Sequence, residues 1–387
     1  MSARIPIRGL YVGSLLLLLL SLSGCWDYKN VQDNNYVTAI GIDFQNDKYI
    51  VYTQSLDFSN VAKQEGVKPK DKVPVWLGRG EGVTLDAAIN NIYNSSQLPI
   101  VWEHTTAIVF HERVLSQNMK SMMDSMLRYH EIRYSPWVFG THVSIKELFA
   151  VNNTFNLAPI NSLLHNPMDM YEQQAYIKPL SLREMLIKLV EPGATLLLPS
   201  LATNSKQWFK DIKPNEQYEV DGIFVIDDNS YKGWQSKADS LGLRWINSSS
   251  ARTALAIGRD NNKHQVLLSM ETSKWDIHVR TQGAVLSYTI KANITGSIDE
   301  MLAPLPESEI EELAEDKVKA EIKHTFKVGL DHNADLYSLH QYVYRQQVTH
   351  WKRQGNGRNI TLSPGDLDNI QVKVKLVHAG MSKLKQK

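Results

Sequence analysis

The chain has 387 residues, with 42 lysines and arginines against 41 aspartates and glutamates, so its formal net charge is +1 at pH 7. This balance gives no electrostatic basis for binding nucleic acid. The single cysteine excludes a disulfide within the chain. The length exceeds what one hydrophobic core usually organises and predicts two or three domains.

Residues 1–24 have the layout of a secretory signal peptide. Arg4 and Arg8 precede an apolar stretch over residues 10–22, and small residues follow it. The stretch is too short for a permanent membrane span, which needs ~20 apolar residues. An uncleaved anchor helix is the alternative interpretation. Cleavage would remove only two charged residues and leave 42 − 2 = 40 basic against 41 acidic groups.

Residues 22–25, with the sequence Leu-Ser-Gly-Cys, look like a bacterial lipobox. In that motif a peptidase cuts before a cysteine whose thiol carries a diacylglyceryl group. One acyl chain binds a membrane only marginally, whereas two or three make a stable anchor. We therefore expect the mature chain to begin at Cys25 and to be tethered to the outer face of a membrane, with a free structural thiol as the alternative.

The N-terminal domain is expected to span residues 25–202. Two runs rich in β-branched and aromatic residues, 35–44 and 48–58, predict a pair of antiparallel strands. Thr84 is a suitable N-cap for a helix that begins at Leu85.

Further along this domain, residues 105–111 predict a strand and residues 112–129 a helix. The methionines of that helix favour an irregular core over an adaptable binding surface. Ser181 and Glu184 have the spacing of a capping box, ahead of a helix that stops at Pro192.

Residues 203–217 are polar and contain proline, and they are the best candidate for a linker between domains. A middle domain is expected over residues 218–298, because alternating apolar residues in 265–298 predict several strands of one sheet.

The C-terminal domain is expected over residues 299–387. Its clearest helix covers residues 307–327, with acids in the first half and lysines in the second, as the helix macrodipole favours. A second helix is expected over 335–352, and the alternation of residues 370–376 predicts a strand with one buried face.

No pattern of catalytic or cofactor-binding residues emerges. The zinc-protease spacing, cysteine clusters, nucleophile elbows and phosphate-binding loops are all absent from the sequence. The carboxylate pairs Asp227-Asp228 and Glu311-Glu312 are best explained as solvated surface. We therefore expect no enzymatic activity and no cofactor or metal.

From Cys25 onward the order of motifs resembles the Ger(x)C family, the lipoprotein C subunits of GerA-type nutrient germinant receptors in spore-forming bacteria. The opening Cys-Trp-Asp, the Gly-Ile-Asp that ends the first strand, the Glu-Ile-Arg triplet after a helix and the Leu-Gly-Leu…Trp pattern carry the likeness. The residues at these and the remaining motif positions are Cys25, Trp26, Asp27, Asp43, His104, Arg128, Glu131, Arg133, Trp245 and Asp335. Those other than Cys25 either hold the fold or contact a partner.

The resemblance implies an α+β chain of three mixed α/β domains, each a largely antiparallel sheet with packed helices. It also implies a non-enzymatic lipoprotein on the outer surface of the inner spore membrane, with two integral-membrane partners, one channel-like and one transporter-like. Ser338 and His340 stand where the family usually has glycines, which suggests that the helix simply continues there.

Two other classes of protein share parts of this pattern. A solute-binding lipoprotein of an ABC importer also has a lipobox and a chain of this size, but it is built on two similar lobes with a hinge. A surface-anchored hydrolase would need a nucleophile or a metal set that the sequence does not offer.

Overall fold

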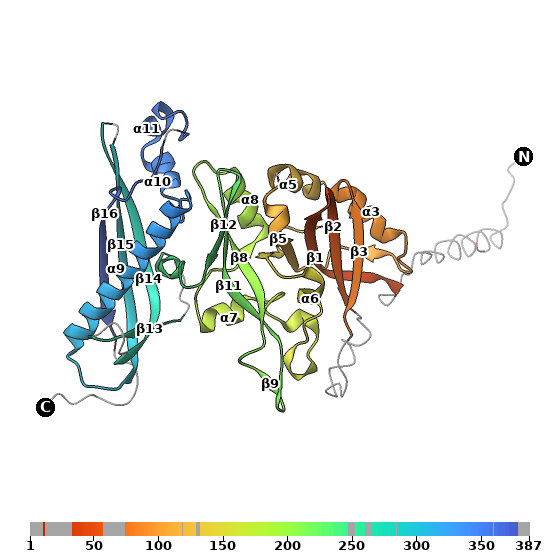
Figure 1. The fold of residues 1–387 in the computed structure, drawn as a ribbon, viewed down its shortest axis with the longest axis horizontal. Coiled ribbons are helices and arrows are strands. Elements are labelled where there is room, and N and C mark those ends of the chain that lie inside the picture. Colours follow the sequence, from red (N-terminus) through yellow and green to blue (C-terminus); the bar gives the residue numbers. More distant parts are fainter. Residues whose placement is uncertain are drawn as a thin grey trace, which may run out of the picture.

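The computed structural model describes residue 11 and residues 33–56, 74–117, 119–128, 132–246, 252–259, 265–283, 285–358 and 360–377. These residues form an elongated body with two sheets side by side along its length (Figure 1). We call the described part of residues 33–236 the N-terminal unit and that of residues 237–377 the C-terminal unit.

The N-terminal unit is built on a ten-stranded sheet. Its strands are β1 Asn35–Gln45, β2 Lys48–Leu56, β3 Trp76–Gly82, β4 Ile100–Val101, β5 Ala107–His111, β6 Trp137–Thr141, β7 Leu180–Ser181, β8 Leu196–Asn204, β11 Gln217–Asp227 and β12 Ser230–Ser236. The order is β12-β11-β8-β6-β5-β1-β2-β3, with β4 beside β1 and β7 beside β6. The sheet is mixed, because β5 is parallel to both β1 and β6.

Helices and short 3-10 turns cover this sheet. They are α3 Leu85–Tyr93, α4 Glu112–Leu115, α5 Met119–Leu127, α6 Ile145–Phe149, η3 Thr154–Asn156, η4 Pro159–Asn161, α7 Met168–Gln173 and α8 Leu182–Val190. The Thr84 side chain accepts a hydrogen bond from the Ala87 backbone N–H, and Ser181 and Glu184 form the expected capping box. Both predicted helix starts are confirmed.

The predicted helix over residues 112–129 is instead two helices, α4 and α5. The apolar spacing continues across the break, so periodicity alone did not reveal it. The four methionines of α5 are buried in the core beneath the sheet, which confirms their expected role in packing. They are Met119, Met122, Met123 and Met126.

The expected linker, residues 203–217, lies within the sheet rather than between domains. β8 and β11 pair antiparallel from Asn204↔Gln217 to Leu196↔Ile226, and the residues between them form a projecting hairpin. β11 and β12, expected in a middle domain, thus complete the N-terminal sheet. Polar residues with proline indicate exposure, which a hairpin tip and a linker share.

The C-terminal unit is a four-stranded sheet with helices packed on it. Its strands are β13 Thr253–Ile257, β14 Val266–Gln282, β15 Val285–Met301 and β16 Leu367–Leu376, in that order. Its helices are η5 Leu241–Trp245, α9 Glu307–Asp331, α10 Leu339–Gln346 and α11 Val348–Arg353. Alternate residues of β16 are buried, as the sequence predicted.

Helix α9 also protects the edge of this sheet. The Val374 and Leu376 backbone N–H groups of β16 donate to Glu315 and Glu311 of α9, at 3.2 and 2.9 Å. An uncovered edge strand offers a template for pairing with another chain. Glu311, expected on a solvated face, therefore has a structural partner.

The α+β class is confirmed. The strands join into two principal sheets, where the resemblance implied three domains, and the larger sheet is mixed rather than largely antiparallel. The pairing of β8 with β11, such as Leu198↔Phe224, joins strands that the local patterns assign to different domains.

The departure from the family pattern at Ser338 suggested that the helix continues there. The structure shows that it does not. Ser338 has φ 50° and ψ 41°, a left-handed conformation, between the end of α9 and the start of α10. Its Oγ accepts a hydrogen bond of 3.1 Å from the buried Thr195 backbone N–H of the N-terminal unit. The backbone turn at this position therefore forms without glycine. The serine side chain makes the left-handed conformation less favourable, but it also joins the two units through its hydrogen bond.

Two substitutions at Ser338 separate the energetic cost of its left-handed backbone from the contribution of its hydrogen bond to stability. Ser338→Ala removes the Oγ and leaves the Thr195 N–H unpaired, so it should lower the free energy of unfolding by about 1–3 kcal/mol. Ser338→Gly loses the same bond but relieves the left-handed strain, and it should be about 1 kcal/mol more stable than Ser338→Ala. Urea denaturation of both variants measures the difference, and equal stabilities would show that the strain is negligible.

Candidate functional site

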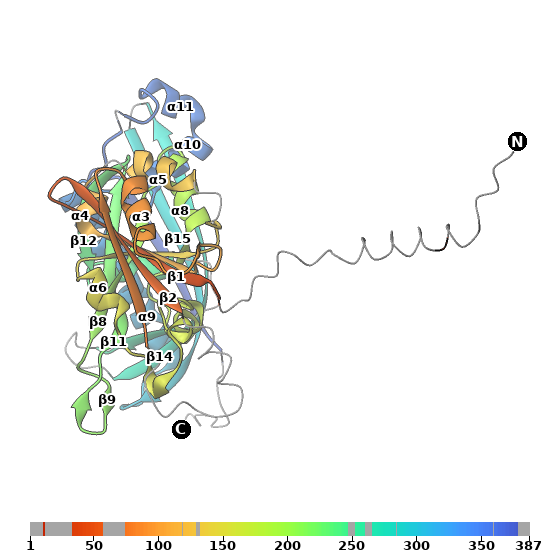
Figure 2. The same cartoon turned by 90° about the vertical axis from the view of Figure 1, so that its right-hand side faces the viewer.

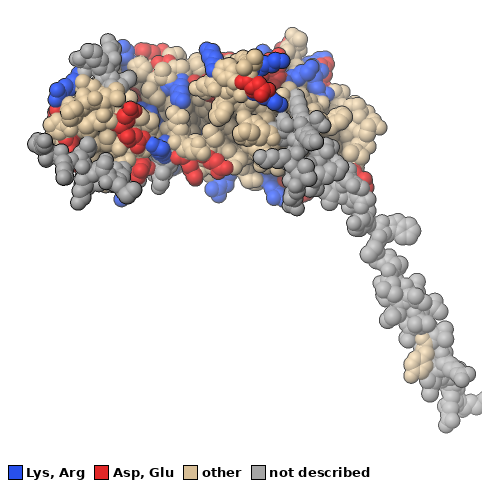
Figure 3. Space-filling model, turned by 90° about the horizontal axis from the view of Figure 1, so that it is seen from below, with Lys and Arg blue, Asp and Glu red and all other residues tan. Residues whose placement is uncertain are grey.

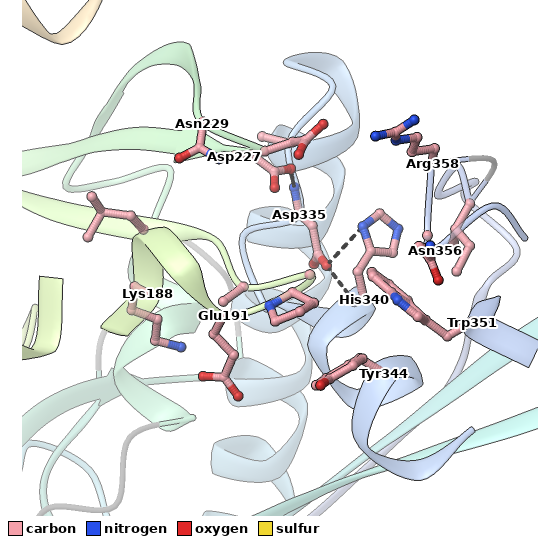
Figure 4. Close-up of a pocket in the computed structure, with 18 of the residues that line it drawn as sticks. Lys188, Glu191, Asp227, Asn229, Asp335, His340, Tyr344, Trp351, Asn356 and Arg358 are labelled. Carbon is pink, nitrogen blue, oxygen red and sulfur yellow. Dashed lines mark hydrogen bonds and ion pairs between the residues drawn. The ribbon is translucent and has the colours of Figure 1, made fainter. Parts of the chain in front are cut away.

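A cavity of about 740 Å³ lies where the two units meet (Figure 4). The N-terminal unit lines it with the end of α8 and the turn between β11 and β12, and the C-terminal unit with the segment after α9 and helices α10 and α11. Lys188 and Glu191 lie on one side of the cavity, and Tyr344 and Trp351 on the other.

Asp335, one of the motif residues, forms part of the cavity wall and is only 2% exposed. Its Oδ2 accepts a hydrogen bond of 2.8 Å from the His340 backbone N–H and lies 3.7 Å from His340 Nδ1. Its Oδ1 and the Nε2 of His340 are buried and have no hydrogen-bond partner among the described residues. Burial raises the pKa of the Asp335 carboxyl; His340 opposes this shift and the nearby Asp227 adds to it.

Several contacts across the cavity fix the two units relative to each other. The Asp335 backbone N–H donates to Asp227 Oδ2 at 3.0 Å, and Asp227 Oδ1 accepts from the Thr195 hydroxyl at 3.2 Å. Glu191 at the end of α8 forms an ion pair with Arg345 of α10. Asp227, expected on a solvated turn, is therefore half-buried and bridges the units.

Gly193 allows the close approach that brings these groups together. It has φ +70°, and a Cβ built on it would lie 2.7 Å from the backbone carbon of His340. Only glycine adopts this conformation readily and leaves room for the opposing chain. The Pro192-Gly193 signal that predicted the end of α8 thus also sets its contact with α10.

The chemistry of the lining suits the binding of a polar group, or the coupling of one unit to the other. It combines a cation whose pKa is lowered by burial, Lys188, with acids and aromatic rings. Within the described ranges, no group of three or more His, Cys, Asp or Glu side chains is placed to hold a metal ion.

Replacing Asp335 by asparagine tests whether the ionised Asp335 carboxylate destabilises the folded state. A carboxyl whose pKa is raised by folding destabilises the folded state when ionised. This cost declines once the pH falls below the folded-state pKa and is gone below the unfolded-state pKa. Asparagine keeps an oxygen that can accept from the His340 N–H. Asp335→Asn should therefore be at least as stable as the wild type at pH 7, and the wild type should gain on it as the pH is lowered.

Denaturation of both proteins between pH 7 and pH 4 measures this trend. Asp228→Asn, at an exposed neighbour in the β11–β12 turn, is the matched control and should follow the wild type throughout. A loss of stability in Asp335→Asn that stays the same from pH 7 to pH 4 would contradict the prediction, because it would show that no carboxyl with a raised pKa is linked to folding at this position.

Asp43, a second motif residue, is buried at the end of β1 in a group of ionic contacts. Arg113 Nε and Nη2 donate to its two oxygens at 3.0 and 2.6 Å, and the Gln45 amide donates at 2.6 Å. Burial by itself raises the pKa of Asp43, but these donors, together with His111 at 3.6 Å, outweigh it and hold the pKa below its usual value. The ion pair between Asp43 and Arg113 fixes the start of α4 against β1.

Trp245 lies in the core of the C-terminal unit, against α9. Its Nε1 donates to Glu321 Oε2 at 2.7 Å, and Arg244 Nη2 donates to both oxygens of the same carboxylate at 2.9 Å. The Arg244 guanidinium also lies 4.7 Å from the Trp245 ring centroid. The Leu-Gly-Leu…Trp pattern therefore forms the turn η5 and docks it on the long helix.

The remaining motif residues are not brought together. His104 is exposed and makes an edge contact with Tyr36, at 4.9 Å between ring centroids. Arg128 is exposed and pairs with Asp124 one helical turn away, and Arg133 is exposed after α5. The other four, Cys25, Trp26, Asp27 and Glu131, lie outside the described residues.

Some residues that organise these contacts were not anticipated from the sequence. Arg113 and Glu321 pair with motif residues, and Arg345 joins the two units. Glu321 stands on the buried stripe of α9, one residue before Ile322, and a charged residue in an apolar stripe is a signal that could have identified it.

No helix in the described part of the chain is both long and apolar enough to cross a membrane.

Two family models match the chain, one in each half. The model described as "Spore germination protein N-terminal domain" matches residues 27–203, and "Spore germination B3/ GerAC like, C-terminal" matches residues 221–380. The gap between them coincides with the hairpin between β8 and β11, although the sheet itself continues through it.

Individual proteins give the same picture. Spore germination protein KC of Bacillus subtilis (strain 168) is 23% identical over 361 residues, which cover 88% of each chain. Spore germination protein B3 of the same strain is 19% identical, covering 88% of this chain and 90% of the other. The crystal structure of the GerBC protein superimposes with a TM-score of 0.54 at 15% identity, over 87% of this chain and 96% of the other, which supports the fold.

Proposed function

Because this chain belongs to the Ger(x)C family of spore germination proteins, we propose that it is the lipid-anchored C subunit of a nutrient germinant receptor. It is not an enzyme, in keeping with that family. It is held by acyl chains on Cys25 at the outer surface of the inner spore membrane, beside one channel-like and one transporter-like integral-membrane subunit. The match of both halves of the chain to germination-protein models carries the proposal.

The mechanism that we propose is docking. A non-catalytic body can change a membrane partner only by binding one of its states more tightly than the other, which shifts the closed-to-open equilibrium. The cavity between the two units is suited to this role, because its contacts would change if the units moved relative to each other.

A solute-binding lipoprotein of an ABC importer is a weaker explanation. Such proteins have two similar lobes, whereas here one unit has a ten-stranded mixed sheet and the other a four-stranded sheet crossed by a long helix. The family to which the chain belongs also consists of germination proteins.

Deleting the gene tests the proposal most directly. In a strain that lacks redundant receptors, the deletion should abolish germination with at least one nutrient, and the wild-type gene should restore it. Germination that does not depend on nutrient receptors should be unaffected, which serves as the control. Normal germination of the deletion strain with every nutrient would contradict the proposal.

A further inference from the structure

A two-stranded hairpin projects from the end of β8 and β11. Its strands β9 Phe209–Lys210 and β10 Lys213–Pro214 pair antiparallel, with Lys210 opposite Lys213 and Phe209 opposite Pro214. The Asn215 N–H also donates to the Trp208 carbonyl at 2.8 Å. In the two perpendicular views of Figures 1 and 2 this hairpin extends beyond the rest of the N-terminal unit.

The hairpin exposes large apolar side chains although its fold is regular. Trp208 is 56% exposed, Phe209 57% and Ile212 91%, and all ten residues from 205 to 214 are exposed. Large apolar side chains that stay more than half exposed on one projecting hairpin mark a surface for another molecule. Lengthening a hairpin to carry such a tip has no evident benefit for the core.

Lysines flank these apolar side chains. Lys206, Lys210 and Lys213 against Asp211 and Glu216 give the hairpin residues 205–216 a local charge of 3 − 2 = +1, in a chain whose mature form is expected to be slightly acidic. Figure 3 shows the molecule from below, relative to the view of Figure 1. Lysines, arginines and acids are interspersed on that face. The lysines and arginines on that face therefore do not form one continuous basic patch.

We infer that this hairpin is a second membrane contact, which inserts its apolar side chains into the interface of an anionic lipid surface. Tryptophan and other apolar rings prefer the headgroup boundary, and adjacent lysines pair with lipid phosphates. The inference rests on the proposed function, in which the acylated Cys25 holds the body near a bilayer. Eight residue steps separate Cys25 from Asp33, so this tether spans at most about 28 Å.

A loop beside the base of the hairpin also exposes an apolar ring. The Gln217 side chain at the base of the hairpin donates to the Asn152 carbonyl at 3.3 Å, which places the loop after α6 beside it. Phe155 in that loop is 81% exposed. Two contacts with the membrane, the lipid tether and the hairpin, would fix the orientation of the body toward its membrane partners, which one flexible tether alone cannot do.

Vesicle flotation of the unacylated mature chain isolates the hairpin from the anchor. Residues 25–387 with Cys25→Ser are mixed with vesicles of equal parts phosphatidylglycerol and phosphatidylcholine, or of phosphatidylcholine alone. We expect salt-sensitive binding to the anionic vesicles. The triple variant Trp208→Ser, Phe209→Ser, Ile212→Ser should bind at least about tenfold more weakly, and each Lys→Gln change should weaken binding roughly fivefold.

The matched control is Val285→Ser with Leu302→Ser, two exposed apolar residues of the C-terminal unit, which should bind like the parent. Thermal unfolding checks that every variant is folded. Quenching of tryptophan fluorescence by brominated lipid should decrease in Trp208→Phe while flotation is retained, because Trp208 itself enters the interface.

Absence of binding by the parent chain would overturn the inference, and so would equal binding by the parent and the triple variant. If the hairpin variant floats normally but no longer co-purifies with membrane subunits, the surface binds protein and the inference is wrong. The lipid anchor is assessed separately, by the mass of the Cys25 peptide from the native protein, so failure of the two ideas can be distinguished.

Discussion

Glu321→Ala is expected to lower the free energy of unfolding by about 3–5 kcal/mol, as is typical when one partner of a buried ion pair is removed. Glu321 is 8% exposed and accepts hydrogen bonds from both Arg244 and Trp245. Alanine would leave the guanidinium and the indole N–H without their shared acceptor inside the core. The loss should also weaken the docking of η5 on α9, since these contacts join the two elements.

Denaturation by urea measures this change, with Glu312→Ala as the matched control. Glu312 is an exposed acid on the same helix, and its replacement should alter stability by no more than about 0.5 kcal/mol. Equal stability of the two variants would contradict the prediction. It would mean that water or another group solvates the Arg244 guanidinium, and that the Glu321 carboxylate is not needed to hold Trp245 in place.

Features set by neighbouring residues could be predicted from the sequence. The Thr84 cap, the Ser181 capping box and the alternating strand near the C-terminus are all where the local pattern placed them. Each depends on interactions within a few residues of the chain, or on which face of one strand is apolar.

Features set by distant pairing could not be predicted. Residues 203–217 have the composition of a linker, but the register of β8 with β11 places them at a hairpin tip. The helix expected over residues 335–352 is divided into α10 and α11, because the chain changes direction at Gln347, where φ is −133°. Apolar spacing that continues across such a break conceals it.

The candidate site also combines a feature that the sequence predicts with one that depends on distant residues. The resemblance to a family motif singles out Asp335, which is one of the most buried acids among the described residues. For its partner Asp227 the sequence predicts solvated surface, because no local pattern indicates that its carboxylate meets a backbone N–H 108 residues away. Sequence reasoning therefore identified single residues of the site but not the contact between the two units that creates it.

Loss of the thiol at Cys25 should move the protein from the membrane fraction to the soluble fraction. Each buried acyl methylene contributes about 0.8 kcal/mol, so removing two or three chains removes nearly all of the anchoring free energy. Because cleavage at a lipobox itself needs the cysteine, the variant Cys25→Ser should be placed behind a signal peptide whose cleavage does not. Fractionation after a high-salt wash measures the shift, and the wild-type chain is the control.

The salt wash separates the two proposed membrane contacts. Hairpin binding depends partly on Lys206, Lys210 and Lys213 and should weaken as salt screens their attraction to lipid phosphates, whereas acyl chains are insensitive to salt. At low salt, Cys25→Ser should therefore retain weak binding that disappears when the hairpin's apolar residues are also replaced. If Cys25→Ser instead stays in the membrane fraction at high salt, neither contact explains its attachment, and the anchor must lie elsewhere in the chain or in a partner.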